Sequence, residues 1–301
     1  MSAVALHALP DGADDARRLA AHLGLPYQEV ALHRFPDGEI QVTTGEAAST
    51  TIIHATLNQP NDKLIALLLA AEALRRNGAK RLVLLAPYLC YMRQDTAFHA
   101  GEAISQRAIG QLLARTVDRV ITVDAHLHRT PDIGMVFPGI EADNLSAIPA
   151  FVATLRDDRV DPSTLVVGPD AESQGWVRAL ADPLGLACAV ARKTRHGDRS
   201  VTIDFADAPS LAGRPVLLLD DIVSSGGTLI TCARVLTAAG ARSIDVLITH
   251  ALYPPEMAAE FAAAGVRSVR SSCSVPHPTN AVRLDDIYAK ALQREISGTA
   301  S

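Results

Sequence analysis

The chain has 301 residues, of which 48% are hydrophobic and 20% charged, and its formal net charge is -5 at pH 7. This length and apolar content suffice for one large domain or for two domains of about 150 residues. The acidic balance, the scattered basic residues and the lack of a long apolar run argue against a nucleic-acid-binding face and a membrane anchor.

Helical and strand patterns alternate along the chain. Residues 62–76 have apolar side chains at helical spacing, Gly78 follows, and residues 81–89 form an apolar run typical of a buried strand. The same order recurs downstream, with helices predicted at 105–115, 173–184, 227–239 and 255–264 and strands at 119–124, 164–168, 244–249 and 268–272. This alternation predicts an α/β fold with mainly parallel sheets flanked by helices.

An internal echo indicates two related halves. The segment LRRNGAKRLVLLAPYL, which begins at Leu74, aligns without gaps with LTAAGARSIDVLITHA, which begins at Leu236. Each contains a helix end, a Gly-Ala pair, a basic residue and an apolar strand, although any helix-to-strand connection can match in this way by chance. We place the boundary near residues 144–149, which gives domains of residues 1–145 and 146–301.

The four cysteines, at positions 90, 188, 232 and 273, are widely spaced and form no CxxC pair. This spacing argues against a zinc site or a disulfide framework and favours reduced thiols. The N-terminal segment reaches acidic residues within fifteen positions and shows no export signal. Together these features predict a cytoplasmic protein.

The segment LLLDDIVSSGGT, at residues 217–228, combines an apolar run, two acids and a turn of small residues before a new helical pattern. Glycines let the backbone approach an anion, hydroxyls add donors and a helix start favours negative charge, which suits a monophosphate. The acids can accept hydrogen bonds from ribose hydroxyls. A plain strand-to-helix turn with solvated acids is the alternative. The candidate sugar-phosphate residues are Asp220, Asp221, Ser224, Ser225, Gly226, Gly227 and Thr228.

Two earlier segments offer groups for a nucleotide. In FPDGEI the turn residues predict a hairpin or loop tip, yet Phe35 offers a ring for stacking, and Asp37 and Glu39 can accept from an exocyclic amine. The segment RQD comprises Arg93, Gln94 and Asp95 and follows a predicted strand. It is either an ordinary exposed loop or a polyphosphate clamp, because a guanidinium pairs with two oxygens.

Three further segments offer metal or phosphate ligands. In VDAHLH, His126 is either a structural residue or a group that contacts a divalent ion or its phosphates. In VVGPD, Asp170 is a hard oxygen ligand suited to Mg²⁺, and it could also cap the helix that follows. In KTRHGDRSV, Lys193 and Arg195 lie in a basic stretch that by itself reads as a solvated hairpin tip.

The loop at 220–228 resembles the phosphoribosyl-diphosphate motif of type I phosphoribosyltransferases and of ribose-phosphate diphosphokinases. The other segments, together with GEAIS from Gly101, resemble motifs of the diphosphokinases in that family's order. The resemblance spans roughly residues 35–286, and its HGDRSV stretch is closer to the archaeal-type branch. It implies two similar phosphoribosyltransferase-like domains, the first on the ATP side and the second on the ribose 5-phosphate side.

The reaction that this resemblance implies is transfer of the β,γ-diphosphoryl group of ATP to the anomeric hydroxyl of ribose 5-phosphate, with Mg²⁺ and release of AMP. In the family the Phe35 segment binds adenine across a subunit interface, which implies a homodimer or a larger homo-oligomer. The resemblance makes Lys193 and Arg195 the catalytic candidates, on a mobile loop. It assigns ATP to Arg93, Gln94, Asp95 and His126, and the metal to His126 and Asp170.

Two other functions use the same sugar-phosphate loop. A phosphoribosyltransferase would join a nucleobase to the activated sugar and release diphosphate, and a regulatory subunit would bind the sugar without chemistry. Retention of the catalytic and metal candidates favours the active diphosphokinase. Ser224 stands where many diphosphokinases carry Asp, and TAFHAGEAIS after the RQD segment lacks the basic residues of the phosphate-regulated branch, which predicts weak or absent phosphate activation.

Overall fold

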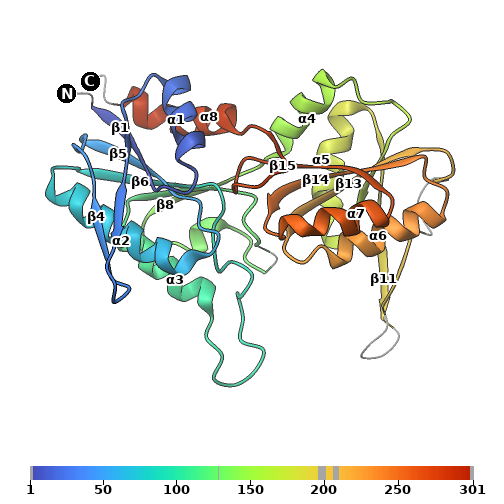
Figure 1. The fold of residues 1–301 in the computed structure, drawn as a ribbon, viewed down its shortest axis with the longest axis horizontal. Helices are drawn as coiled ribbons and strands as arrows, with labels where there is room; N and C mark the ends of the chain where they lie inside the picture. The colour runs from blue at the N-terminus through green and yellow to red at the C-terminus, as the bar shows by residue number, and fades with distance from the viewer. Residues whose placement is uncertain (1–2, 128, 196–200, 206–209, 299–301) are drawn as a thin grey trace. The chain divides into compact units, whose positions relative to one another are not determined.

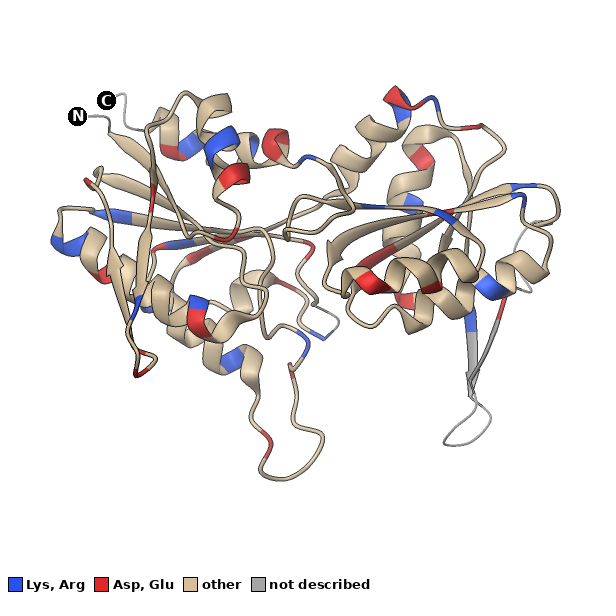
Figure 2. Ribbon diagram, in the orientation of Figure 1, with Lys and Arg blue, Asp and Glu red and all other residues tan. Residues whose placement is uncertain are grey.

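The computed structural model describes residues 3–127, 129–195, 201–205 and 210–298, with only the backbone at 193–195 and 201–203. The chain forms two compact units (Figure 1). Unit 1 comprises Met1–Ser146, Ser274–Pro276 and Asp285–Ser301, and unit 2 comprises Ala147–Cys273 and His277–Leu284. No helix in the described ranges is long and apolar enough to cross a membrane. Acidic and basic residues are interspersed along the elements of each unit (Figure 2).

Unit 1 contains a six-stranded sheet in the order β2-β1-β5-β6-β7-β8, and every neighbouring pair is parallel. Helices α1 and α8 lie on one face, and α2 and α3 lie on the other (Figure 1). The strands are β1 (Val4–Ala8), β2 (Tyr27–Glu29), β5 (Thr50–His54), β6 (Arg81–Ala86), β7 (Arg119–Val123) and β8 (Glu141–Leu145). The helices are α1 (Ala13–Leu23), α2 (Pro60–Arg76), α3 (Ser105–Ala114), the short η1 (Ile133–Met135) and α8 (Asp285–Ser297). An antiparallel hairpin, β3 (Ala31–Arg34) and β4 (Ile40–Thr43), follows β2.

The sequence explains the central helix of this unit. α2 begins with Pro60 in its first turn, where a missing N–H costs nothing, and it ends before Gly78, whose φ of +105° an L side chain rarely adopts. Its buried stripe, which includes Leu67 and Leu74, packs in one core with Leu82 and Leu84 of β6. Burying a leucine side chain stabilises a fold by about 1.5–3 kcal/mol, so this stripe fixes the helix on the sheet.

Unit 2 contains a second six-stranded parallel sheet, in the order β10-β9-β13-β14-β15-β16. The strands are β9 (Leu165–Gly168), β10 (Ala187–Val190), β13 (Pro215–Val223), β14 (Ser243–Ala251), β15 (Val266–Ser272) and β16 (Asn280–Val282). The helices are α4 (Ile148–Asp157), α5 (Gln174–Ala181), α6 (Gly227–Ala238) and α7 (Ala258–Ala263), with short turns η2 (Ala171–Ser173), η3 (Asp182–Leu184) and η4 (Pro255–Met257). An antiparallel hairpin, β11 (Arg192–Arg195) and β12 (Val201–Asp204), follows β10. The expected α/β fold with two parallel sheets is confirmed.

The two units have the same strand topology, which agrees with the internal echo. In each, a hairpin lies between the second and third strands of the chain order, so β3–β4 corresponds to β11–β12. Thr50 pairs with the first residue of β6, and Pro215 pairs with the first residue of β14. Counting from these pairs, Ala55 and Thr56 occupy the positions of Asp220 and Asp221. Unit 1 therefore lacks the acid pair at the corresponding strand end.

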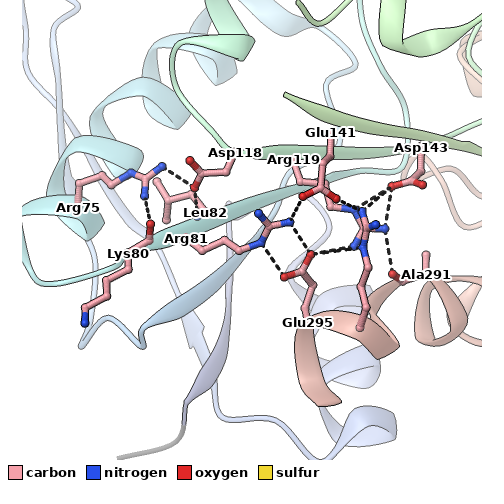
Figure 3. A network of polar contacts seen from close by, with 11 residues as sticks. Arg75, Lys80, Arg81, Leu82, Asp118, Arg119, Glu141, Asp143, Ala291 and Glu295 are labelled. Carbon is pink, nitrogen blue, oxygen red and sulfur yellow. Dashed lines mark hydrogen bonds and ion pairs between the residues drawn. The ribbon is translucent and has the colours of Figure 1, made fainter. Parts of the chain in front are cut away.

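The C-terminal helix α8 belongs to unit 1 by its contacts, whereas the division at residue 145 assigned it to the second half. The buried Arg119 of β7 donates to Glu295 of α8 at 2.9 Å, to the Ala291 carbonyl at 3.0 Å and to Asp143 of β8 at 2.8 Å. Arg81 of β6 donates to the same Glu295 carboxylate at 2.8 and 2.9 Å (Figure 3). These charge-assisted bonds attach α8 to the first sheet, a return of the chain that local sequence patterns cannot show.

Candidate functional site

The predicted sugar-phosphate loop lies at the carboxyl edge of the second sheet, where ligands of open α/β sheets bind. β13 runs beyond its apolar stretch, because it stays paired with β14 at Asp220 opposite Ile248 and at Ile222 opposite His250. The two acids are therefore part of the strand, whereas the sequence pattern suggested that the strand ends at them. The loop itself is a short turn between β13 and α6.

Gly226 gives this turn its shape. Its φ is +70°, a backbone conformation that favours glycine, and an added Cβ would be in tight contact with Met257 Cε at 3.1 Å and Phe261 Cζ at 3.2 Å. As the N-cap of α6 it offers no side chain to the first-turn amides of the helix, which can therefore bind an anion. The neighbouring Ser224, Ser225, Gly227 and Thr228 are exposed.

Carboxylates gather beside this turn. Burial raises the pKa of Asp220 well above its ordinary value, and the charges of Asp221 and Asp170 raise it further. Asp170 is the N-cap residue of η2, but its side chain accepts no cap hydrogen bond, and its carbonyl instead accepts the Ser173 hydroxyl at 2.5 Å. The structure thus brings the predicted metal ligand Asp170 into the electrostatic neighbourhood of the predicted ribose ligand Asp220.

This donor set fits a hard divalent cation, because mutually repelling carboxylates are stabilised by positive charge. Within the described part of the chain, no group of three His, Cys, Asp or Glu residues is arranged to hold a metal by itself. A site with fewer than three such protein ligands is compatible with Mg²⁺, which keeps several waters and typically takes one or two carboxylates together with substrate phosphates.

Lys193 and Arg195 lie at alternate positions of β11, opposite Ile203 and Val201 of β12. Their side chains and residues 196–200 lie outside the described residues. The hairpin starts at the acid-bearing edge of the sheet, because the Ala191 amide donates to the carbonyl of Gly168, at the end of β9, at 2.9 Å. The predicted basic segment and Asp170 therefore belong to neighbouring connections of unit 2.

In unit 1 the RQD loop and the VDAHLH loop follow the adjacent strands β6 and β7. Arg129 Nη1 donates to Asp95 at 2.7 Å, so the two loops are joined. The Thr130 hydroxyl donates to Gln106 of α3 at 3.1 Å. Gln94 accepts the Ser105 hydroxyl at 2.6 Å and so braces the start of α3. Arg93 is exposed. Arg129 was not among the residues predicted from the sequence, because its partner Asp95 lies 34 positions away.

Strained backbone marks the same edge of the first sheet. Asp124, directly after β7, has φ +38°, and Tyr91, in the loop after β6, has φ +62°. Hydrogen bonds hold these conformations: the Asp124 amide donates to Leu145 at 2.8 Å, and the Tyr91 hydroxyl donates to Asn61 at 2.5 Å. Non-glycine residues in this region cost about 1–3 kcal/mol each and cluster at functional sites. The half-buried His126 lies two residues beyond Asp124.

Phe35, Asp37 and Glu39 form the exposed tip of the β3–β4 hairpin. The Phe35 amide donates to the Glu39 carbonyl at 2.8 Å, and the Glu39 amide donates to Asp37 Oδ1 at 3.1 Å. His33 packs edge-on against the Phe35 ring at 4.8 Å.

A pocket of about 400 Å³ lies between this hairpin and α2. Lys63 lines it, and its ammonium donates to Asn58 at 2.7 Å and to the Thr56 carbonyl at 3.2 Å, with Asp11 at 2.8 Å. Lys63 thus neutralises Asp11, the acid that follows β1. At the corresponding edge of the unit 2 sheet, carboxylates gather instead. The acid pair and the glycine turn of the candidate sugar-phosphate site belong to unit 2.

The duplicated parallel sheet and the acid-bearing strand followed by a glycine turn define an α/β protein of the phosphoribosyltransferase class. A family model of the phosphoribosyl transferase domain matches residues 147–260, and a model of the N-terminal domain of ribose phosphate pyrophosphokinase matches residues 6–116. The ribose-phosphate pyrophosphokinase of Bradyrhizobium diazoefficiens is 33% identical and covers 89% of this chain and 84% of its own. That of Thermococcus kodakarensis is 32% identical, with 87% and 91% covered.

The chain therefore belongs to the ribose-phosphate pyrophosphokinase family, also called ribose-phosphate diphosphokinases, which confirms the resemblance. The ribose-phosphate pyrophosphokinase of Methanopyrus kandleri is 29% identical, with 95% of this chain and 97% of its own length covered. The crystal structure of phosphoribosylpyrophosphate synthetase from Mycobacterium smegmatis shares the fold, with a TM-score of 0.84, 24% identity and coverage of 98% and 99%.

Proposed function

We propose that this chain transfers the β,γ-diphosphoryl group of ATP to the anomeric hydroxyl of ribose 5-phosphate, giving 5-phosphoribosyl 1-diphosphate and AMP. Family membership supports this reaction. The observation that carries it is the combination, in unit 2, of an acid cluster and an uncapped helix N-terminus on either side of Gly226. In this proposal residues 1–145 bind ATP and residues 146–301 bind the sugar phosphate. Helix α8 lies in the second range but packs in unit 1.

The ribose 5-phosphate half of the site is the turn before α6. Ser225, Gly226, Gly227 and Thr228 bind the 5-phosphate through hydroxyls and first-turn amides, since a helix start favours an anion. Asp220 and Asp221 accept hydrogen bonds from the ribose hydroxyls. Ser224 adds a neutral hydroxyl to this turn.

Asp170 is the unit 2 residue that we assign to Mg²⁺. His126 is the unit 1 residue that we assign to a divalent ion or the ATP phosphates bound to it. The repulsion among Asp170, Asp220 and Asp221 supports a cation at this edge. When bound, Mg²⁺ neutralises charge on the phosphate oxygens of ATP. The protein residues in turn orient the sugar hydroxyl and the diphosphoryl group for in-line transfer.

The ATP half of the site is built on the joined loops of unit 1. Arg93 clamps the polyphosphate with its planar guanidinium, while Gln94 and Asp95 fix the loop through Ser105 and Arg129. Phe35, Asp37 and Glu39 supply the adenine contacts from a second copy of the chain. In this assignment the active form is a homodimer or a larger homo-oligomer.

Lys193 and Arg195 are the catalytic residues of this proposal. Two positive charges on a hairpin at the acid-bearing edge stabilise the negative charge that grows on the diphosphoryl group and on the leaving AMP. Removing one such group commonly costs on the order of 10²-fold or more in rate. Lys193→Ala should therefore abolish most turnover and leave the unfolding temperature unchanged. Near-normal turnover would overturn the assignment.

One product analysis tests the function itself. The protein is incubated with ATP, ribose 5-phosphate and Mg²⁺, and the nucleotides and sugar phosphates are separated. Equimolar AMP and phosphoribosyl diphosphate are expected. Diphosphate release from phosphoribosyl diphosphate and a nucleobase would instead identify a phosphoribosyltransferase, and sugar-phosphate binding without turnover would identify a regulatory subunit.

The four free cysteines support a cytoplasmic site of action.

A further inference from the structure

The loop between β6 and α3 carries an exposed aromatic side chain close in sequence to the RQD segment. Phe98 is 64% exposed. A single exposed apolar residue is ordinary on a protein surface and by itself indicates no function. The loop around this one is braced, however, because the Phe98 and His99 amides both donate to the Glu102 carboxylate, at 2.7 and 3.1 Å. These hydrogen bonds fix the backbone that presents the exposed Phe98 ring to solvent.

Arg129 connects this ring to the RQD segment. Its guanidinium carbon lies over the Phe98 ring, 5.5 Å from the centroid, and its Nη1 donates to Asp95 at 2.7 Å. The Asp95 side chain is only 4% exposed, so the ion pair is anchored at its acidic end. A guanidinium above one side of the ring leaves the rest of this exposed ring available to a flat partner.

We propose that Phe98 stacks on the purine base of ATP. The proposal rests on the ATP site assigned above to Arg93 and the joined loops. Every base has a π-face that stacks on an aromatic ring, and a cation behind the ring strengthens such a contact. Phe98 is three residues from Asp95, so one short loop holds both the polyphosphate and a platform for the base. It acts in addition to Phe35 from a second copy.

Binding measurements by calorimetry test this without requiring turnover. Wild-type protein, Phe98→Ala and Phe98→Trp are titrated with Mg-ATP and with Mg-tripolyphosphate, which has no base. Loss of one stacking contact should weaken ATP binding roughly 5- to 100-fold in Phe98→Ala and leave tripolyphosphate binding within about twofold. Phe98→Trp should retain ATP affinity, because an indole also stacks. In steady state, Phe98→Ala should raise the KM for ATP and not that for ribose 5-phosphate.

Met135→Ala is the matched control, since Met135 is equally exposed in the same unit at 68%. Its affinity for ATP should equal that of the wild type. Equal ATP affinity in wild type and Phe98→Ala would overturn the stacking proposal and leave the proposed reaction standing. Failure of the wild type to bind ATP would overturn both. A loss of affinity that accompanies dissociation into single chains by light scattering would show that Phe98 acts between copies, which also overturns it.

Discussion

The charge of Asp170, which follows β9, raises the pKa of Asp220 on the neighbouring strand β13. Burial is the largest cause of the raised pKa of Asp220, the adjacent Asp221 adds to it, and the charge of Asp170 raises it further. A carboxyl with a raised pKa favours the folded state while it is protonated. That stabilisation is complete below the unfolded pKa, about 4, and is lost as the pH rises through the raised value.

A divalent cation should reverse this loss, because it favours the ionised carboxylates. We predict that the increase in unfolding temperature caused by saturating Mg²⁺ is larger at pH 8 than at pH 5. In Asp220→Asn the free protein should be at least as stable as the wild type at pH 8, and the increase should be small at both pH values. A cation-dependent increase in the wild type that does not change between pH 5 and 8 would contradict this.

Gly226 and Gly227 should respond differently to the same substitution. Gly226→Ala puts a side chain at φ +70° against Met257 and Phe261, and left-handed backbone costs an L residue about 1–2 kcal/mol even without a clash. At Gly227 the nearest atom to an added Cβ is Ser225 Oγ at 4.0 Å. Denaturant unfolding should therefore show a loss of stability for Gly226→Ala alone. Equal stability of the two variants would refute this account of the turn.

Glu295 should be essential to the stability of unit 1. Burial alone would raise its pKa, but hydrogen bonds and charge from Arg81 and Arg119 lower it below the ordinary value. Breaking a buried ion pair by removing one partner costs about 3–5 kcal/mol, so Glu295→Ala should lower the free energy of unfolding by that order. Glu72→Ala, which removes an exposed helical pair with Arg76, should cost less than about 0.5 kcal/mol. Similar losses in both variants would contradict the network's importance.

Acid should destabilise unit 1 through His54. Burial lowers its pKa to about 4, so the folded state favours neutral imidazole. The associated stability is present above the unfolded pKa of about 6.5 and is lost as the pH falls toward 4, in total on the order of 3 kcal/mol. The buried Nδ1 has no hydrogen-bond partner among the residues described, so His54→Leu should fold. Its unfolding free energy should fall less steeply than that of the wild type between pH 6.5 and 4, and an identical slope would refute the role of His54.

Local signals predicted much of this fold. The helix expected at 227–239 is α6, Gly227–Ala238, because two glycines and a clear apolar period mark its start and face. The extent of β13 was missed, since an acid pair within a strand becomes tolerable only when β14 pairs with it. The return of α8 was missed because it depends on Glu295 meeting Arg119 across 176 residues.

For the candidate site, the sequence predicted which segments supply the residues, and the roles of those residues stay predictions. Sequence placed Arg93, Asp95 and His126 in connections that follow strands, and turn residues such as those around Asp37 predicted a hairpin tip. The ion pair of Asp95 with Arg129 and the electrostatic coupling of Asp170 with Asp220 depend on contacts between segments far apart in sequence. No residue pattern within one segment encodes them. Arg129 became visible only when two adjacent strand ends were seen together.

The fate of labelled phosphorus tests the proposed reaction most directly. The protein is supplied with Mg²⁺, ribose 5-phosphate and ATP labelled at either the α- or the γ-phosphorus. Transfer of the intact diphosphoryl group predicts that γ-label appears in phosphoribosyl diphosphate and α-label appears in AMP, in equal amounts. Formation of ADP, or of free labelled phosphate without phosphoribosyl diphosphate, would contradict it.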